Sequence, residues 1–242
     1  MSLHMRTFVI GDIHGGLRAL EALLASIKPG EEDLLIFLGD YVDGWSQAAE
    51  TVDYLIALKN RIPCRLLRGN HDALCLQWLS EGTAHPLWLQ SGGQATRESY
   101  EGVETHIRNE HIRFFESLEN YYLDEANRLF LHAGFTNLKG VGHEYFSQNF
   151  YWDRTLWETA LALDPGLERD DPRYPSRLRQ YREIYLGHTP VTRLGYSEPC
   201  KAANIWNMDT GAGFKGPLSA MEISTKKIWQ SQPVFQYYPG ER

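Results

Sequence analysis

The sequence has little cysteine, no long apolar run and no cluster of basic residues. Its three cysteines, Cys64, Cys75 and Cys200, are odd in number and their spacing suits neither a disulfide framework nor a zinc site. We interpret them as small core residues of a protein in the reducing cytoplasm. No stretch approaches the roughly 18–20 apolar residues of a membrane span, and no cationic segment followed by an apolar one marks a signal peptide. We therefore expect a cytoplasmic protein with no membrane partner.

The net charge indicates which classes of binding partner to expect. The formal net charge is −7 at pH 7 and no basic block is present, so we expect no nucleic acid as the main partner. Hydrophobic residues make up 43% of the 242 positions, which is enough for a sizeable core. We predict a single domain over residues 1–242, in which residues 1–4 resemble the remnant of an expression tag before a natural start at Met5.

Apolar segments in the first half of the chain alternate between strand and helix patterns. Such alternation predicts parallel strands covered by helices. A predicted hairpin and four further predicted strands follow in the second half, whereas residues 82–104, 136–152 and 164–176 show no regular pattern. The predicted strands are residues 6–10, 34–38, 64–67, 121–124, 128–132, 183–186, 204–208, 218–223 and 226–230, and the predicted helices are residues 17–27, 47–58, 72–79 and 107–118.

Five short polar motifs each follow an apolar run directly. An apolar run that ends in glycine or histidine and further polar residues indicates a buried strand feeding a tight turn. Because ligand sites in open α/β sheets lie at the carboxyl ends of the strands, we expect the polar side chains of these motifs to meet at one edge. The motifs occupy residues 11–15, 39–43, 69–72, 132–134 and 187–189.

The residue types in these motifs suit a pair of divalent metal ions. Asp12 and His14 are two residues apart, so in an extended chain both side chains would face one ion. Asp40 can bridge two ions because a carboxylate has two oxygens. Carboxylate, imidazole and amide oxygen together fit manganese, iron or zinc, of which we expect manganese. The ligands predicted to complete the second ion are Asn70, His132 and His188.

Two further residues of the motifs suit proton transfer. His71 follows Asn70 directly and cannot easily bind the same ion while both lie in a tight turn. Its unperturbed pKa near 6.5 suits a general acid that protonates a leaving oxygen. Asp43 could accept a hydrogen bond from this imidazole and fix its tautomer, although an ordinary turn or helix cap would also place an aspartate there.

The order of the five motifs resembles the serine/threonine phosphoprotein phosphatases, in their phage and bacterial branch within the calcineurin-like metallophosphoesterases. The resemblance extends over residues 8–221, and residues 88–100 and 209–211 also resemble the bacterial branch. It implies a four-layer αββα sandwich with two mixed β-sheets flanked by helices. It also implies one metal held by Asp12, His14 and Asp40, a second held by Asp40, Asn70, His132 and His188, and His71 and Asp43 as the acid and its orienting partner.

The resemblance implies phosphate-binding arginines, and here the sequence matches it only in part. Arg154 and Arg68 stand where the family pattern has arginine, although either would also suit a surface ion pair. After Asp43, however, the family normally has arginine and this chain has Gly44 followed by Trp45. We hypothesise that the loop leaves room for a second substituent on phosphorus, or that Trp45 stacks on a base or aromatic leaving group; packing of Trp45 against the helix it opens is the alternative.

The sequence therefore predicts a dinuclear metal-dependent phosphoesterase. A metal-bridging hydroxide would attack phosphorus, with His71 as the general acid. A bacterial-type protein serine/threonine phosphatase is the first choice. A symmetrical diadenosine tetraphosphate hydrolase, or a phosphodiesterase, is the alternative, so the expected partner is a phosphorylated protein or a nucleotide. A third possibility is a catalytically weak binding protein on the same fold, against which the full set of ligand residues argues.

Overall fold

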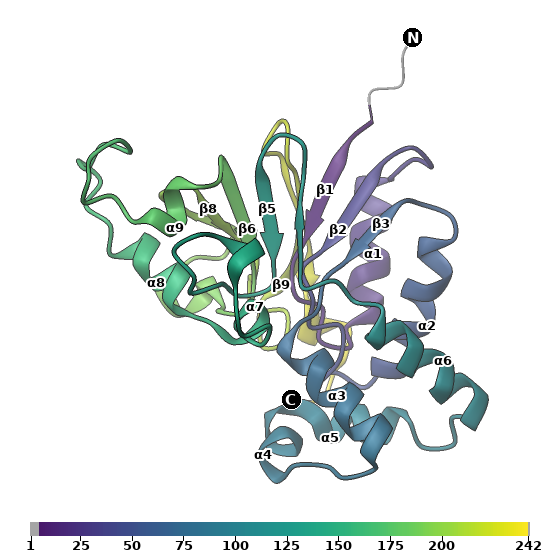
Figure 1. The fold of residues 1–242 in the computed structure, drawn as a ribbon. Helices are drawn as coiled ribbons and strands as arrows, with labels where there is room; N and C mark the ends of the chain where they lie inside the picture. Colours follow the sequence, from purple (N-terminus) through teal and green to yellow (C-terminus); the bar gives the residue numbers. More distant parts are fainter. Residues whose placement is uncertain (1–4, 242) are drawn as a thin grey trace.

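The computed structural model describes residues 5–241, so the expected tag remnant at residues 1–4 lies outside the described residues. Two five-stranded sheets pack face to face, and helices cover the outer face of each (Figure 1). The helices α1 and α2 cover one sheet, and α8 and α9 cover the other. The predicted four-layer αββα sandwich is confirmed.

The first sheet has the order β10-β9-β1-β2-β3. Its strands β1, β2 and β3 are parallel, whereas β9 is antiparallel to both β1 and β10. Helix α1 connects β1 to β2, and α2 connects β2 to β3, as the alternating pattern predicted. The elements are β1 (Thr7–Ile10), α1 (Leu17–Ile27), β2 (Leu34–Phe37), α2 (Ala48–Lys59), β3 (Cys64–Leu66), β9 (Pro217–Glu222) and β10 (Ile228–Pro233).

The second sheet has the order β4-β5-β6-β8-β7. Its central strands β5, β6 and β8 are parallel, and β4 and β7 lie antiparallel at the two edges. Strand β7 was not predicted, because its sequence, Cys-Lys-Ala, contains no apolar run. The strands are β4 (Tyr121–Leu123), β5 (Arg128–Leu131), β6 (Glu183–Leu186), β7 (Cys200–Ala202) and β8 (Ile205–Asn207).

Alternation along the strands divides the apolar side chains between three cores. In β1, Phe8 and Ile10 pack with the helices outside the first sheet, while Val9 between them packs with the second sheet. In β5, Leu129 packs with the outer helices and Phe130 joins Val9 between the sheets. Successive side chains of a strand point to opposite faces, so a strand buried on both faces reads as a continuous apolar run. These runs are the signal by which the strands were found.

The regions predicted as irregular contain short helices. Residues 82–104 hold α4, a π-helical turn and α5, with Gly92 at φ 110° in the middle. Residues 82–104 show no helical pattern in the sequence, because each of these helical pieces is shorter than the two turns that a periodicity needs. The remaining helices are α3 (Asn70–Glu81), α4 (Pro86–Trp88), η1 (Leu89–Gly93), α5 (Gln94–Ser99), α6 (Thr105–Glu116), η2 (Val141–His143), α7 (Asn149–Trp152), α8 (Thr155–Leu161), α9 (Ser176–Arg179), η3 (Val191–Leu194) and η4 (Val234–Gln236).

The three cysteines are all at least partly buried. Cys75 is buried in the core beside the first sheet, and Cys64 and Cys200 are half-buried. All three thiols are free. Within residues 5–241, no helix combines the length and the apolar character that crossing a membrane requires.

Candidate metal centre and active site

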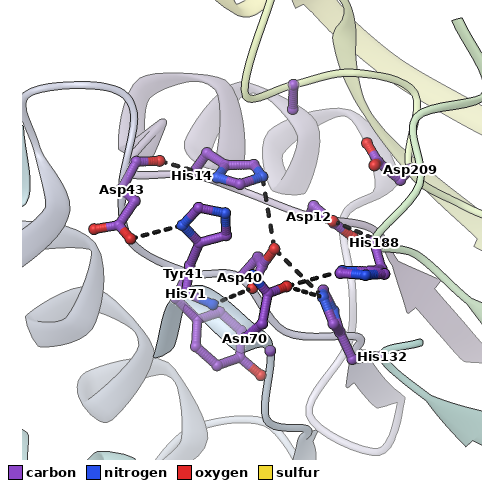
Figure 2. A network of polar contacts seen from close by, with 12 residues as sticks. Asp12, His14, Asp40, Tyr41, Asp43, Asn70, His71, His132, His188 and Asp209 are labelled. Carbon is purple, nitrogen blue, oxygen red and sulfur yellow. Dashed lines mark hydrogen bonds and ion pairs between the residues drawn. The ribbon is translucent and has the colours of Figure 1, made fainter. Parts of the chain in front are cut away.

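The five polar motifs meet at one edge of the two sheets, as the sequence predicted. Asp12 follows β1, Asp40 follows β2, and Asn70 opens α3 just beyond β3. His132 and His188 follow β5 and β6 of the other sheet. Figure 2 shows these side chains pointing toward one another across the edge. The site therefore lies where the carboxyl ends of strands from both sheets come together.

The backbone at the motifs is not extended. His14, Asp40, Asp43 and His188 have φ of 56°, 53°, 69° and 67°, a region that residues other than glycine seldom occupy. The prediction of an extended chain across Ile13 was wrong: the N–H groups of Ile13 and His14 both donate to the carbonyl of Asp40. A tight turn, rather than strand alternation, brings His14 to Asp40. Such left-handed residues concentrate where the surrounding structure holds a functional geometry.

One group of donor atoms converges around Asn70. The Nε2 atom of His132 lies 3.3 Å from Oδ2 of Asp40 and 3.1 Å from Oδ1 of Asn70. The Nδ1 atom of His188 lies 2.8 Å from the same Asn70 oxygen. The other ring nitrogen of His132 is 2.9 Å from the carbonyl oxygen of Leu38, which favours a proton on Nδ1 and a free lone pair on Nε2. These four side chains can hold one cation.

A second group shares Asp40. The Nε2 atom of His14 lies 3.8 Å from Oδ2 of Asp40, and its Nδ1 is 2.9 Å from the carbonyl oxygen of Asp43. Asp12 is buried; its Oδ2 accepts the N–H of His188 at 3.0 Å, while its Oδ1 has no hydrogen-bond partner among residues 5–241. Because a buried polar atom without a partner costs free energy, this oxygen indicates a missing ligand. Asp40 lies between the two groups and can serve both.

The electrostatics of the pocket fit divalent cations. Burial, together with the carboxylates of Asp209 and Asp40, raises the pKa of Asp12 well above its ordinary value. Burial likewise lowers the pKa of His14 to about 4 and that of His188 to about 2, so both imidazoles are neutral near pH 7. Neutral imidazole is the form that binds metal, and cations would offset the repulsion among the buried carboxylates. The residues present therefore fit a pair of divalent ions.

His71 and Asp43 lie in contact beside these groups. The Nδ1 atom of His71 is 2.6 Å from Oδ2 of the fully buried Asp43. Burial opposes protonation of His71, but Asp40 and Asp43 outweigh it and raise the pKa of His71 to about 9. The backbone N–H of His71 also donates to Oδ1 of Asp40 at 3.0 Å. His71 thus lines the cavity at the two groups of candidate ligands, the metal groups below, where its protonated form can donate a proton.

The segment predicted as irregular holds Asp43 in place. The indole N–H of Trp88 and the hydroxyl of Thr96 donate to the two carboxylate oxygens of Asp43, each at 2.6 Å. The Thr96 oxygen in turn accepts the backbone N–H of Asp43 at 2.9 Å. Trp88 and Thr96 belong to residues 88–100, which resemble the bacterial branch, but no motif spacing in the sequence predicted their contact with Asp43. Their hydrogen bonds fix the orientation of the Asp43 carboxyl group, which contacts His71 through Oδ2.

Two more carboxylates belong to the site, and sequence reasoning assigned no role to either. Asp72 accepts the backbone N–H groups of Asp40, Tyr41 and Gly69, each at 2.8 Å, and so ties the end of β2 to the start of α3. Its place in the third position of α3, where acidic residues cap helices, was the available signal. Asp209 is buried and lines the cavity at the metal groups.

The two predicted arginines lie in different places. Arg154 is exposed at the mouth of the site, where its charge helps to lower the pKa of His188. Arg68 is not brought to the mouth: its guanidinium donates to the carbonyl oxygens of Phe115 and Glu116 at 3.1 and 3.3 Å. These carbonyls are at the end of α6, where unpaired backbone oxygens attract cations. The prediction that Arg68 binds substrate therefore has no support in the geometry.

The Gly44–Trp45 pair also differs from one expectation. Trp45 is fully buried, stacks on Tyr238 at 5.5 Å between ring centroids and donates its indole N–H to Ala212. The hypothesis that Trp45 stacks on a bound base is wrong: the ring packs in the core, and its stacking partner is Tyr238 rather than the following helix named in the alternative. Gly44 has φ of 122°, so any other residue there would be strained.

Comparison with known proteins agrees with this geometry. A family model described as calcineurin-like phosphoesterase matches residues 5–212. The chain is 26% identical to a symmetrical bis(5'-nucleosyl)-tetraphosphatase from Neisseria gonorrhoeae, over 94% of this chain and 96% of the relative. It is 27% identical to an asymmetrical bis(5'-nucleosyl)-tetraphosphatase from a Geobacillus species, over 95% and 96%.

Two other similarities bear on fold and motifs. A serine/threonine-protein phosphatase PP2A-like protein from Saccharomyces cerevisiae is 40% identical, but over 29% of this chain and 20% of its own length. A solved structure of a putative diadenosine tetraphosphatase has a TM-score of 0.63 at 20% identity, and the match covers 95% of this chain and 94% of that one. Because the family model spans most of the chain, the chain belongs to the calcineurin-like phosphoesterase family.

Proposed function

We propose that this phosphoesterase hydrolyses dinucleoside polyphosphates with two divalent ions, manganese first among them. The observation that carries the choice of substrate is the extent of similarity. Tetraphosphatases of both kinds align with 94–95% of the chain, whereas the yeast phosphatase aligns with 29%. This reverses the order of the two candidates expected from the motifs.

The proposed mechanism assigns a role to each residue of the site. Asp12, His14 and Asp40 would hold one ion, and Asp40, Asn70, His132 and His188 the other. When bound, such a pair supplies an activated water and offsets charge on the transferring phosphoryl oxygens. Arg154 contacts phosphoryl oxygens at the mouth.

Proton transfer completes the reaction. As the bond from water oxygen to phosphorus forms and the bond to the leaving oxygen breaks, His71 donates its proton to that leaving oxygen. Asp43 holds the imidazole through the 2.6 Å contact at Nδ1, which leaves Nε2 as the donor. No covalent enzyme intermediate is needed.

A substrate panel tests the proposal. With added manganese, we expect kcat/KM for diadenosine tetraphosphate to exceed that for a serine phosphopeptide by about 10²-fold or more, the scale on which a site built for one ligand rejects another. Chromatography of the products then distinguishes two molecules of ADP from AMP plus ATP. Preference for the phosphopeptide would restore the protein phosphatase, which the local 40% identity to the yeast enzyme favours. Absence of turnover with any phosphoester, with metals bound, would indicate the binding protein.

We expect Trp88→Phe to slow the hydrolysis of substrates with poor leaving groups more than the hydrolysis of substrates with good ones. The change removes the N–H that donates to Asp43 at 2.6 Å while an aromatic ring stays in the core. A less firmly held Asp43 positions His71 less well, so kcat for phenyl phosphate should fall about 10-fold. The fall for p-nitrophenyl phosphate should be smaller because its leaving group needs little protonation. Steady-state assays of both esters check this, and an equal loss for the two would contradict it.

A further inference from the structure

The cleft outside the metal groups is larger than one phosphoryl group requires. A cavity of about 110 Å³ at the metal groups shares His71, Arg154 and Phe214 among its lining residues with a cleft of about 980 Å³. Trp152 and Phe214 both line this cleft, and they are 45% and 53% exposed. Exposed aromatic rings that line a cleft beside a catalytic site are typical of ligand contacts.

The two rings belong to opposite ends of the metal site. Trp152, at the end of α7, meets the ring of His188 edge-on at 6.3 Å between centroids. Phe214 follows Gly213, whose backbone lies so close to His14 that a Cβ added there would be 2.6 Å from the imidazole. His188 belongs to one ligand group and His14 to the other. A phosphate chain bound across both groups would therefore have one aromatic ring near each end.

The charges in the cleft complement a polyphosphate. Arg193, on the turn η3 after His188, lines both the small cavity and the large cleft, as Arg154 does. Neither guanidinium has an ion pair or hydrogen bond to a residue in the range 5–241. Two carboxylates also line the cleft, and they accept hydrogen bonds from side chains of the protein, Glu98 from Gln94 and Glu241 from Ser46. Two guanidinium groups beside the metal site are therefore available to bind phosphate.

We propose that Trp152 and Phe214 stack on the nucleobases of the substrate and that Arg193 binds a phosphate beyond the one at the metal groups. This deepens the proposed function and rests on it. Stacking suits any base because every base has a π-face, and the two rings match the two bases of a dinucleoside polyphosphate. Arg193 supplies a guanidinium for phosphate where the family arginine after Asp43 is replaced by Gly44.

Competition assays on the manganese-loaded enzyme test this assignment. Hydrolysis of p-nitrophenyl phosphate is inhibited with ADP or with pyrophosphate, which has the phosphates without the base. Trp152→Ala and Phe214→Ala should raise Ki for ADP, at one ring or both, by about 5–150-fold, the usual worth of a base–aromatic stack, with Ki for pyrophosphate unchanged. Arg193→Ala should raise both values. Trp152→Phe, which keeps a ring, should restore most of the ADP affinity, whereas Trp152→Leu should not.

The controls separate failure of the subsite from failure of the proposed function. Tyr145→Ala removes an aromatic ring that is 87% exposed and does not line the cleft, so neither Ki should change. If diadenosine tetraphosphate is hydrolysed but Ki for ADP is unchanged in both alanine variants, the subsite is wrong. If Ki for ADP responds as expected but the dinucleotide is not hydrolysed, the subsite stands and the proposed substrate is wrong.

Discussion

We expect Asp40→Asn to abolish tight binding of the metal pair and, with it, turnover. Oδ2 of Asp40 lies 3.3 Å from Nε2 of His132 and 3.8 Å from Nε2 of His14, so this oxygen faces both ligand groups. Burial opposes ionisation, but the imidazoles of His132 and His71 hold the pKa of Asp40 below its usual range, so the group is a carboxylate near pH 7. Asparagine keeps the shape, removes the negative charge and presents N–H donors toward the ions.

The expected loss of metal affinity in Asp40→Asn exceeds the loss caused by changing a residue that only hydrogen-bonds to a metal ligand. Mutation of a hydrogen-bonding partner of a metal ligand typically costs about 10–100-fold in affinity, and loss of a shared ligand should cost more. Metal analysis after dialysis against manganese should find two ions per wild-type chain and fewer than one in the variant. Asp33→Asn is the matched control, since Asp33 is also buried but pairs with Arg6, outside the ligand groups. Two tightly bound ions in Asp40→Asn would refute the shared-ligand assignment.

The parts of the fold that the sequence predicted are those set by local pattern. Helix α1 spans Leu17–Ile27, the predicted bounds, because its apolar residues recur at helical spacing over almost three turns. Strands β1 and β2 were found because their residues are buried on both faces. The segment from α4 to α5 was missed because its order depends on distant contacts: Trp88 and Thr96 bond to Asp43, which is 45 and 53 residues away.

In the candidate site, too, features set by local pattern were predictable and features set by distant contacts were not. The identities of the polar residues and their places after strands were enough to bring them together, because parallel strands end at one edge. The direction of individual side chains was not predictable. Arg68 and Arg154 both match a family pattern, yet Arg68 turns to the end of α6, whose carbonyls no spacing in the sequence reveals. Trp45 turns inward onto Tyr238, which lies 193 positions further along the chain.

His71→Asn should slow the reaction without emptying the site. His71 lies close enough to His14 and Asp40 for the three to hold an ion together, so a ligand role is the competing assignment. Its Nδ1 contact to Asp43 at 2.6 Å favours the acid instead, because this contact leaves a protonated imidazole with one free donor. We expect kcat to fall by about 10²–10⁴-fold, the usual worth of general acid catalysis, with KM little changed.

Metal content and leaving-group dependence distinguish the two assignments. If His71 is the acid, the variant keeps two manganese ions and loses more activity with phenyl phosphate than with p-nitrophenyl phosphate, since the better leaving group departs without a proton. If His71 is a ligand, the metal content falls and both esters suffer alike. His111→Asn serves as the control: this fully buried histidine bonds to Tyr100 and Asp53, neither of which is a candidate metal ligand, so its loss should lower Tm and leave the ratio of the two esters unchanged.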